Sequence, residues 1–179
     1  TGCGVPNLTA VFQIWNTFQG FEKTIPPRII ADGGIKTTSD IAKYLSAGAD
    51  GVMIGNLFSR CHESAGWSKN IFYSLAHSLI PIHLFKNKIY SKKYRGQASS
   101  AFQLERRGSV SGAPEGVEGQ LLHPEYFATD LMQNIFNSLA SSLSYLGLRR
   151  IKDLSPDKVK FIRITPSSVR ESNPNPNFR

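Results

Sequence analysis

Cysteine is scarce in this sequence, and the residues that most often bind metals are scattered. Cys3 and Cys61 are the only cysteines among 179 residues. Two cysteines so far apart exclude a disulfide framework and indicate a reducing compartment, so we expect a cytoplasmic protein. Zinc-ligand spacing is also missing from the four histidines, which are His62, His77, His83 and His123.

Long apolar runs and a surplus of acid are missing too. The apolar-leaning stretch 71–84 is too short to span a bilayer and contains His77 and Pro81, and we find no signal peptide. We therefore expect no membrane partner. Lys and Arg number 21 against 13 Asp and Glu, and the net charge of +8 suits anionic partners such as nucleotides. RNA-reading motifs are absent, so we expect no nucleic acid.

The most informative stretch that is present covers residues 28–56. The apolar run Arg28–Asp32 predicts a short strand, which Gly33 and Gly34 end. Thr38 or Ser39 can cap a helix that Gly48 ends in a left-handed conformation. A second apolar run, Val52–Ile54, ends at Gly55. This order predicts two parallel strands joined by a helix.

The ends of these two strands predict a phosphate site. Gly33-Gly34 and Gly55-Asn56 expose backbone N–H groups, as the last strands of phosphate-binding barrels commonly do. Asp32 ends the first strand, where its carboxylate can accept hydrogen bonds from ribose hydroxyls. A carboxylate that only caps the loop is the alternative for Asp32.

Periodicity and turn residues predict the remaining elements. We expect a helix capped by Asn7 or Thr9, a short helix over 57–63, a helix within 68–84 ending before Pro81, a strand or hairpin within 86–97, helical turns over 98–104, an extended segment over 121–127, a helix over 130–146 ended by Gly147, a helical turn over 151–154 and a strand over 159–164.

Six short motifs follow one another along the chain. They are A-D-G-G-I at 31–35, D-I-A-K at 40–43, G-A-D-G-V-M-I-G at 48–55, H-E-S at 62–64, K-Y-R-G at 93–96 and P-E-G-V-E-G at 114–119. This series resembles the IMP dehydrogenase/GMP reductase family. The resemblance runs over nearly the whole chain, from T-G-C-G-V-P at 1–6 to F-I-R-I-T at 161–165 and E-S-N at 171–173.

The resemblance implies an α/β fold, the C-terminal part of a (β/α)₈ TIM barrel with a flap-like insertion after the last barrel strand. Residues 1–179 would be the C-terminal portion of one catalytic domain whose N-terminal half is absent, with a mobile flap over 85–120 and an extended tail over 172–179. It further implies a homotetramer that binds a purine mononucleotide (IMP, GMP or XMP) and a nicotinamide cofactor, NADPH or NAD.

The resemblance also implies roles for individual residues. A catalytic cysteine that attacks purine C2 would lie upstream of Thr1, so none is expected in this chain; Cys3 stands past that place, and Cys61 is expected to be structural. The family usually has Ser or Gly at Asn56 and Met at Gln97. The nucleotide-binding residues implied are Asp32 for the ribose, Gly33, Gly34, Gly55, Asn56 and Tyr94 for the phosphate, Gly96, Gln97, Ala98 and Ser99 along the base, and Glu115 with Gly116 at the N1 and O6 edge.

Two features resemble the dehydrogenase, which converts IMP and NAD to XMP. One is P-E-G-V-E-G, and the other is the segment 161–173, whose equivalent in the dehydrogenase supplies carbonyls to a potassium ion. Potassium ligands would then be Glu171, Ser172 and Asn173, with Asn173 in place of the family's His.

Other features resemble the reductase, which converts GMP and NADPH to IMP and ammonia. Residues 97–103 and 139–147 look like reductases, although the reductase's usual Glu is missing near Ser100 and Ala101. The segment between Tyr94 and Glu115 is short and lacks the Arg-Tyr pair that activates water in the dehydrogenase; Arg106-Arg107 could substitute. Because a reductase has no water step, we favour the reductase. A truncated or degenerate paralogue that binds nucleotide without catalysis is a further alternative.

Overall fold

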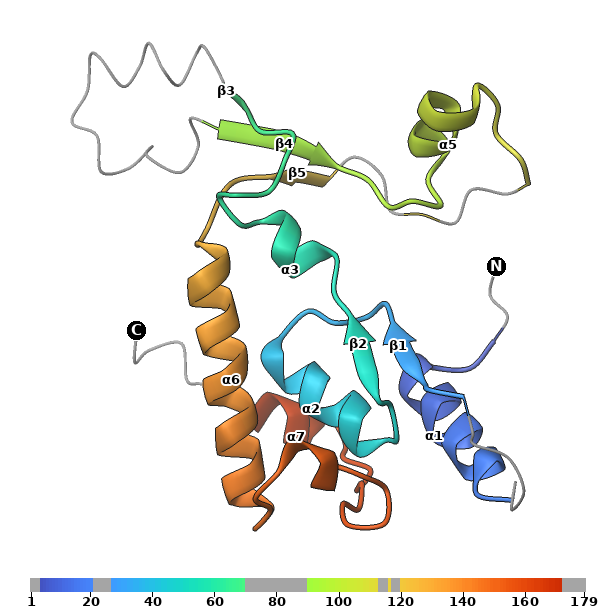
Figure 1. The fold of residues 1–179 in the computed structure, drawn as a ribbon, viewed down its shortest axis with the longest axis vertical. Helices are drawn as coiled ribbons and strands as arrows, with labels where there is room; N and C mark the ends of the chain where they lie inside the picture. The colour runs from blue at the N-terminus through green and yellow to red at the C-terminus, as the bar shows by residue number, and fades with distance from the viewer. Residues whose placement is uncertain (1–3, 21–26, 70–89, 113–115, 117–119, 172–179) are drawn as a thin grey trace, which may run out of the picture.

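The computed structural model describes residues 4–20, 27–69, 90–112, 116 and 120–171. Figure 1 shows a long helix, α6 (Ala128–Tyr145), along one side, with a small sheet at one end of the molecule. Helix α2 (Thr38–Ser46) packs between α6 and two short strands, and α1 (Asn7–Phe18) lies on the far flank.

The predicted strand–helix–strand unit is confirmed as β1 (Ile30–Asp32), α2 and β2 (Gly51–Met53). The two strands are parallel, with Asp32 opposite Met53. Only the middle residue of β1, Ala31, is buried, because it faces the helices. Ile30 and Met53 lie on the other face and remain 61% and 55% exposed.

Helix α2 begins at Thr38 and its N-cap residue is Thr37, so the prediction of Thr38 or Ser39 as the cap is wrong. The reason is Asp40, whose carboxylate accepts hydrogen bonds from the N–H groups of Lys36 (3.1 Å) and Thr37 (2.9 Å). Gly48 ends the turn after α2 with φ +105°, as predicted.

Helix α1 follows Pro6, so neither Asn7 nor Thr9 caps it. Asn7 instead directs its amide to the backbone oxygen of Asp32, at 3.1 Å. The Asn7 side chain therefore links α1 to the end of β1, and in the described part of the chain α1 has no side-chain hydrogen bond to the free N–H groups of its first turn.

The chain then turns through α3 (Asn56–Ser59), which is shorter than the predicted helix over 57–63. Residues 68–69 form strand β3 (Ser68–Lys69), which corrects the expected helix there; residues 70–84 of that prediction are not described. Strand β3 pairs antiparallel with β4 (Tyr90–Tyr94), and β4 pairs antiparallel with β5 (Gln120–Leu122). Helix α5 (Ser100–Arg107) follows β4.

Helix α6 starts at Ala128, two residues before the predicted start. The Glu63 carboxylate accepts the N–H of Ala128 at 3.0 and 3.1 Å, which stabilises this earlier start. The buried stripe of Leu131, Ile135 and Leu139 packs on α2. Leu146, the C-cap residue of α6, lies outside this stripe and is 45% exposed.

The C-terminal segment confirms the helical turn predicted over 151–154 but not the strand predicted after it. A 3₁₀ turn, η3 (Ile151–Asp153), is held by Asp153, whose carboxylate binds Arg150 and Lys158. The hydrogen bonds from Arg150 and then Lys158 lower the pKa of Asp153. Residues 159–164 are not a strand, because Val159 packs into the core and no described strand pairs with them. Helix α7 (Pro166–Glu171) follows.

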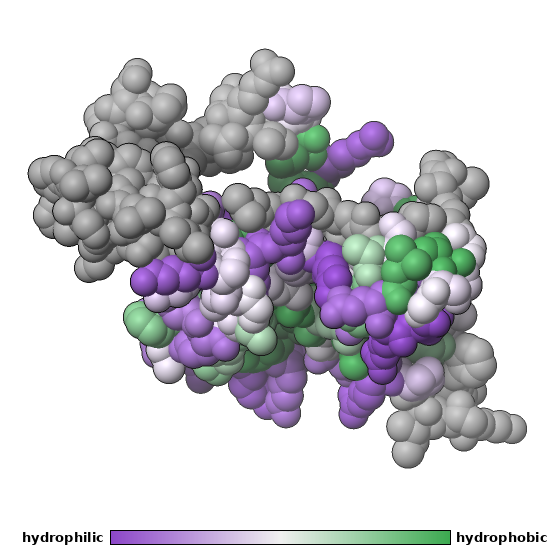
Figure 2. Space-filling view, turned by 90° about the horizontal axis from the view of Figure 1, so that it is seen from above, coloured by the Kyte–Doolittle hydropathy of each residue, from purple (hydrophilic) through white to green (hydrophobic). Residues whose placement is uncertain are grey.

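The described residues form a two-stranded parallel sheet with its helices and a separate three-stranded antiparallel sheet. Two parallel strands cannot close a barrel, so the described residues show an α/β fold but no complete barrel. In the view from the sheet end, Figure 2 shows hydrophilic side chains interleaved with smaller hydrophobic areas. Among the helices described, none combines the length and apolar character that a bilayer crossing requires.

Candidate functional site

A cavity of about 820 Å³ lies at the carboxyl ends of β1 and β2. It brings together six of the predicted binding residues, which come from β1, α3, β4 and the turns after β1 and β2. Its walls are formed by Asp32, Gly33, Gly34, Ile35, Lys36, Met53, Gly55, Asn56, Leu57, Arg60, Tyr94, Glu125 and Tyr126.

The turn after β1 requires its two glycines. Gly33 and Gly34 adopt φ of +87° and +75°, a region that side chains other than glycine rarely enter. A Cβ on Gly34 would also lie 3.0 Å from the Tyr44 hydroxyl. The turn is thus packed between Asn7 of α1 and Tyr44 of α2, and it leaves the Asp32 side chain exposed at the cavity.

Tyr94 reaches the start of α3 from the other sheet. A Cβ on Gly55 would lie 3.1 Å from the Tyr94 hydroxyl, so the hydroxyl sits directly over the turn between β2 and α3. Residues 39 positions apart in the sequence therefore share one end of the cavity, as the phosphate prediction requires.

The predicted base-lining residues lie in a second group. Gln97 and Ala98 line a cavity of about 320 Å³ together with Phe102, Gln103, Arg106 and Arg107. The arginine pair thus lies beside residues expected to line the base.

Gly116 packs directly on the backbone of this group. Its N–H donates to the Ala98 oxygen at 3.2 Å, and a Cβ would come within 2.3 Å of the Ser99 nitrogen. Ser99 is fully buried and its hydroxyl accepts the N–H of Phe102 at the start of α5. The N–H of Ser99 in turn donates to the Gly96 oxygen at 3.0 Å. Ser99 therefore supports the loop with a side chain that serves as a helix cap.

Several predicted residues fall outside the description. Cys3, Glu115, Ser172 and Asn173 are not described, and Glu171 is the last residue of α7. In the described ranges, no three His, Cys, Asp or Glu side chains are grouped to hold a metal ion. The carbonyl ligands predicted for potassium lie at 171–173, of which only Glu171 is described, so the potassium site stays a prediction.

Four polar residues of the main cavity were missed by sequence reasoning: Lys36, Arg60, Glu125 and Tyr126. Arg60 follows Asn56 by four positions, a spacing that places both on one helix face, so a signal for it existed. Glu125 and Tyr126 carried no such signal, because only tertiary pairing brings them to α3. The N–H of His62 donates to the Tyr126 oxygen, and the Tyr126 hydroxyl donates to the Leu57 oxygen, each at 3.0 Å.

Behind α3, Cys61 is buried and Lys92 is half-buried. Burial, followed by the Glu63 charge, raises the pKa of the Cys61 thiol, which disfavours the reactive thiolate. Burial lowers the pKa of Lys92, whose ammonium lies 4.3 Å from the Trp67 ring centre. Cys61 is 2% exposed and lies in the core, in agreement with a structural role.

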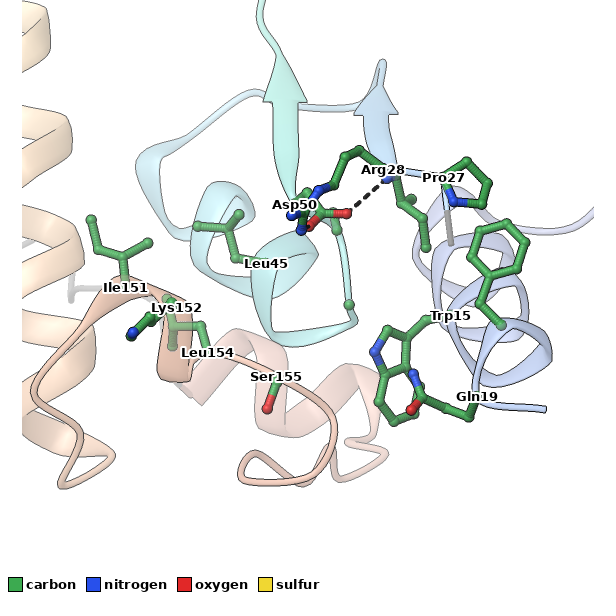
Figure 3. Close-up of a pocket in the computed structure, with 14 residues that line it drawn as sticks. Trp15, Gln19, Pro27, Arg28, Leu45, Asp50, Ile151, Lys152, Leu154 and Ser155 are labelled. Atoms are coloured by element: carbon green, nitrogen blue, oxygen red, sulfur yellow. Dashed lines mark hydrogen bonds and ion pairs between the residues drawn. The ribbon is translucent and has the colours of Figure 1, made fainter. Parts of the chain in front are cut away.

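A separate cavity of about 660 Å³ lies at the opposite ends of β1 and β2 (Figure 3). Trp15, Leu45 and Leu154 give it apolar walls, and Arg28 pairs with Asp50 at 2.7 Å on one side. It contains none of the predicted binding residues. The candidate site is therefore the cavity at the carboxyl ends of the strands.

Comparisons with known proteins show which family the chain resembles. Residues 1–175 match the model of the IMP dehydrogenase / GMP reductase domain. The chain is 36% identical to the inosine-5'-monophosphate dehydrogenase of Borreliella burgdorferi over 177 residues, which cover 99% of this chain and 41% of the relative. It is also 36% identical to the enzyme of the same name from Aquifex aeolicus, covering 96% of this chain and 32% of the relative.

A solved structure is similar as well. It is a cysteine-to-alanine variant of GMP reductase from Trypanosoma brucei in complex with guanosine 5'-monophosphate, with a TM-score of 0.71 and 29% identity. The match covers 97% of this chain and 32% of that one. The chain thus spans about a third to two-fifths of the length of these relatives.

Proposed function

Because the chain belongs to the IMP dehydrogenase/GMP reductase family of purine-nucleotide oxidoreductases, we propose that it forms the nucleotide-binding part of such an enzyme. In this proposal the cavity beside Asp32, Gly55 and Tyr94 binds a purine nucleoside 5'-monophosphate. The observation that carries it is the convergence of Tyr94 on the glycine turn at Gly55.

Each group has a chemical role in this proposal. Asp32 accepts hydrogen bonds from the ribose hydroxyls, and the turns at Gly33-Gly34 and Gly55-Asn56 surround the phosphate, to which Tyr94 donates its hydroxyl. Gly96, Gln97, Ala98 and Ser99 line the base, and Glu115 with Gly116 binds its N1 and O6 edge. The contact of Gly116 with Ala98 supports one continuous base-binding loop. The reacting cysteine is the one that the resemblance assigns upstream of Thr1.

The complete barrel and its divisions are part of the same proposal. Residues 1–179 would form the C-terminal portion of one (β/α)₈ domain, with 85–120 as a flap and 172–179 as a tail. The apolar Ile30 and Met53, exposed on the β1–β2 face away from α2, support it, because that face would line the interior of a closed barrel. A homotetramer in the cytoplasm and a potassium site at Glu171, Ser172 and Asn173 remain further parts of the proposal.

The implied nicotinamide cofactor fits the charge of a neighbouring cavity. A space of about 610 Å³ beside Tyr94 is lined by Lys92, Lys93 and Arg95, cations that suit the phosphates of NADPH or NAD. When bound, the nicotinamide would supply or accept the hydride. The protein's own contribution is to orient the purine and hold its phosphate.

Between the two activities, we favour GMP reduction. The described residues 106–112 contain no Arg-Tyr pair, and without general-base help a hydrolytic step would lose on the order of 10²–10⁴ in rate. Reduction of GMP needs no water activation, because ammonia leaves purine C2 and a hydride takes its place.

IMP dehydrogenation is the second candidate, and specific observations favour it. Arg106 and Arg107 line the same cavity as Gln97 and Ala98, where one of them could replace the missing pair. The sequence relatives named above are dehydrogenases.

An activity assay of the intact protein separates the candidates. With GMP and NADPH, a reductase consumes NADPH and releases ammonia and IMP; with IMP and NAD, a dehydrogenase forms NADH and XMP. XMP formation without GMP reduction would overturn the reductase proposal. Nucleotide binding with neither reaction would instead identify a paralogue that binds without catalysis.

A further inference from the structure

Arg60 extends from the C-terminal end of α3 into the same cavity as Asn56 and Tyr94. Its Nε donates to the Asn56 side-chain oxygen at 3.1 Å. A guanidinium can only donate, so this contact turns the amide oxygen of Asn56 toward Arg60. Asn56 and Arg60 thereby form one polar unit along a single face of α3.

Glu125 holds the same arginine from the other side. Arg60 Nη1 pairs with the Glu125 carboxylate, and the Glu125 N–H donates to the Arg60 backbone oxygen at 3.0 Å. The Arg60 side chain is 26% exposed, so it is packed yet open to the cavity. Its orientation is therefore set before any ligand binds.

The charges of the cavity indicate what this arginine can bind. Two cations, Lys36 and Arg60, line it with two carboxylates, Asp32 and Glu125. Asp32 lies on β1, whereas Glu125 is the counterion of Arg60, whose Nε contacts Asn56, the residue next to Gly55. A phosphate bound at Gly55 could accept hydrogen bonds from the arginine, and a charge-assisted pair of this kind is stronger than a neutral one.

We propose that Arg60, oriented by Asn56 and Glu125, donates hydrogen bonds to the 5'-phosphate and makes the site select nucleotides over nucleosides. This inference rests on the proposed nucleotide site and adds to it a binding residue specific to the phosphate. Glu125 then has a distinct role, since it competes with the phosphate for the same guanidinium.

Calorimetry on the intact protein with GMP and guanosine, and with IMP and inosine, tests the proposal. For Arg60→Met we expect monophosphate affinity to fall about tenfold to a hundredfold, with nucleoside affinity unchanged. The matched control is Arg28→Met, which removes an ion-paired arginine at the opposite ends of the same strands and should leave all four affinities unchanged. Unchanged monophosphate affinity in Arg60→Met, or an equal loss for the nucleosides, would overturn the proposal.

Glu125→Gln distinguishes a phosphate ligand from a residue that only fastens α3 to the 125–126 segment. If Arg60 binds phosphate, removing its competing carboxylate should keep or raise GMP affinity. If Arg60 is only a fastener, Glu125→Gln and Arg60→Met should weaken GMP binding alike, and that result would contradict the proposal. A wild-type protein that binds neither monophosphate would overturn the proposed function itself, and this inference with it.

Discussion

At the residue scale, Gly48 shows how backbone conformation and packing can require the same residue. It has φ +105°, and a Cβ there would lie 2.4 Å from Cγ of Trp15. The Trp15 atoms concerned are near the root of its side chain, so the ring cannot simply swing away. The glycine allows α1 to pack against the turn that ends α2.

Gly48→Ala should therefore destabilise the protein more than the same substitution at a glycine that has a positive φ but no close neighbour. Gly147 is the matched control, because it has φ +67° and no atom of the described residues lies within 4 Å of the place a Cβ would take. We expect Gly147→Ala to cost about 1–2 kcal/mol and Gly48→Ala to cost about 1–3 kcal/mol more from overpacking. Chemical denaturation measures both, and equal losses would show that Trp15 adapts freely.

Asp32 is the residue on which the proposed ribose contact depends. Asp32→Ala should weaken GMP binding about tenfold or more, because a hydrogen bond to a charged group is lost. In the wild type, 2'-deoxy-GMP should bind more weakly than GMP, whereas the variant should bind the two alike. Calorimetry with both ligands checks this, and a variant that still distinguishes them would remove Asp32 from the ribose site.

At the scale of elements, α2 depends on one carboxylate at its first turn. Asp40 accepts hydrogen bonds from Lys36 N–H, Thr37 N–H and the Thr37 hydroxyl. Burial by itself would raise its pKa, but the hydrogen bonds from Thr37 and Lys36 together lower it. The ionised form is therefore the one that the folded protein favours.

Asp40→Ala should destabilise the protein by about 1 kcal/mol at neutral pH, the usual cost of losing a helix cap. Since the pKa is lower in the folded state, this contribution is full above the unfolded value of about 4 and is lost as pH falls through the folded value. Thermal unfolding from pH 7 to pH 2 should show the variant and wild type converging at the acid end. A constant difference would contradict the titration.

At the scale of the whole molecule, the packing of α6 on α2 joins the β1–α2–β2 unit to the chain that follows β5. Leu139 is 5% exposed in this interface, whereas Leu146 at the end of α6 is 45% exposed. Helix α3, which also contacts α6, begins at Asn56, one of the proposed binding residues. Loosening the interface would therefore also disturb the relation between Gly55 and Tyr94.

Leu139→Ala should reduce the free energy of unfolding by about 2–5 kcal/mol, because it leaves a cavity in the core. The control Leu146→Ala should change it by about 0.5 kcal/mol or less. Denaturant titration of both variants provides the measurement. Similar losses in the two variants would show that α6 does not form the described core contact.

Sequence predictions were correct where the interactions are between neighbours in the sequence, and wrong where they join residues far apart in it. The β1–α2–β2 unit was correct because its strands, glycines and helix depend on neighbours in the sequence. The cap of α1 was wrong because Asn7 bonds to Asp32, 25 residues away. The strand predicted over 159–164 was wrong because alternation alone supplies no pairing partner.

The sequence by itself determined the family, the glycine turns after both parallel strands, and the presence of helix α6, since these follow from residue type and local spacing. Only the tertiary structure decided that Tyr94 reaches Gly55, that Gly116 packs on Ala98, and that Asn56 and Glu125 hold Arg60 at the cavity. Those contacts join segments from different strands and helices. Their geometry depends on how whole elements pack, which no local pattern of residues specifies.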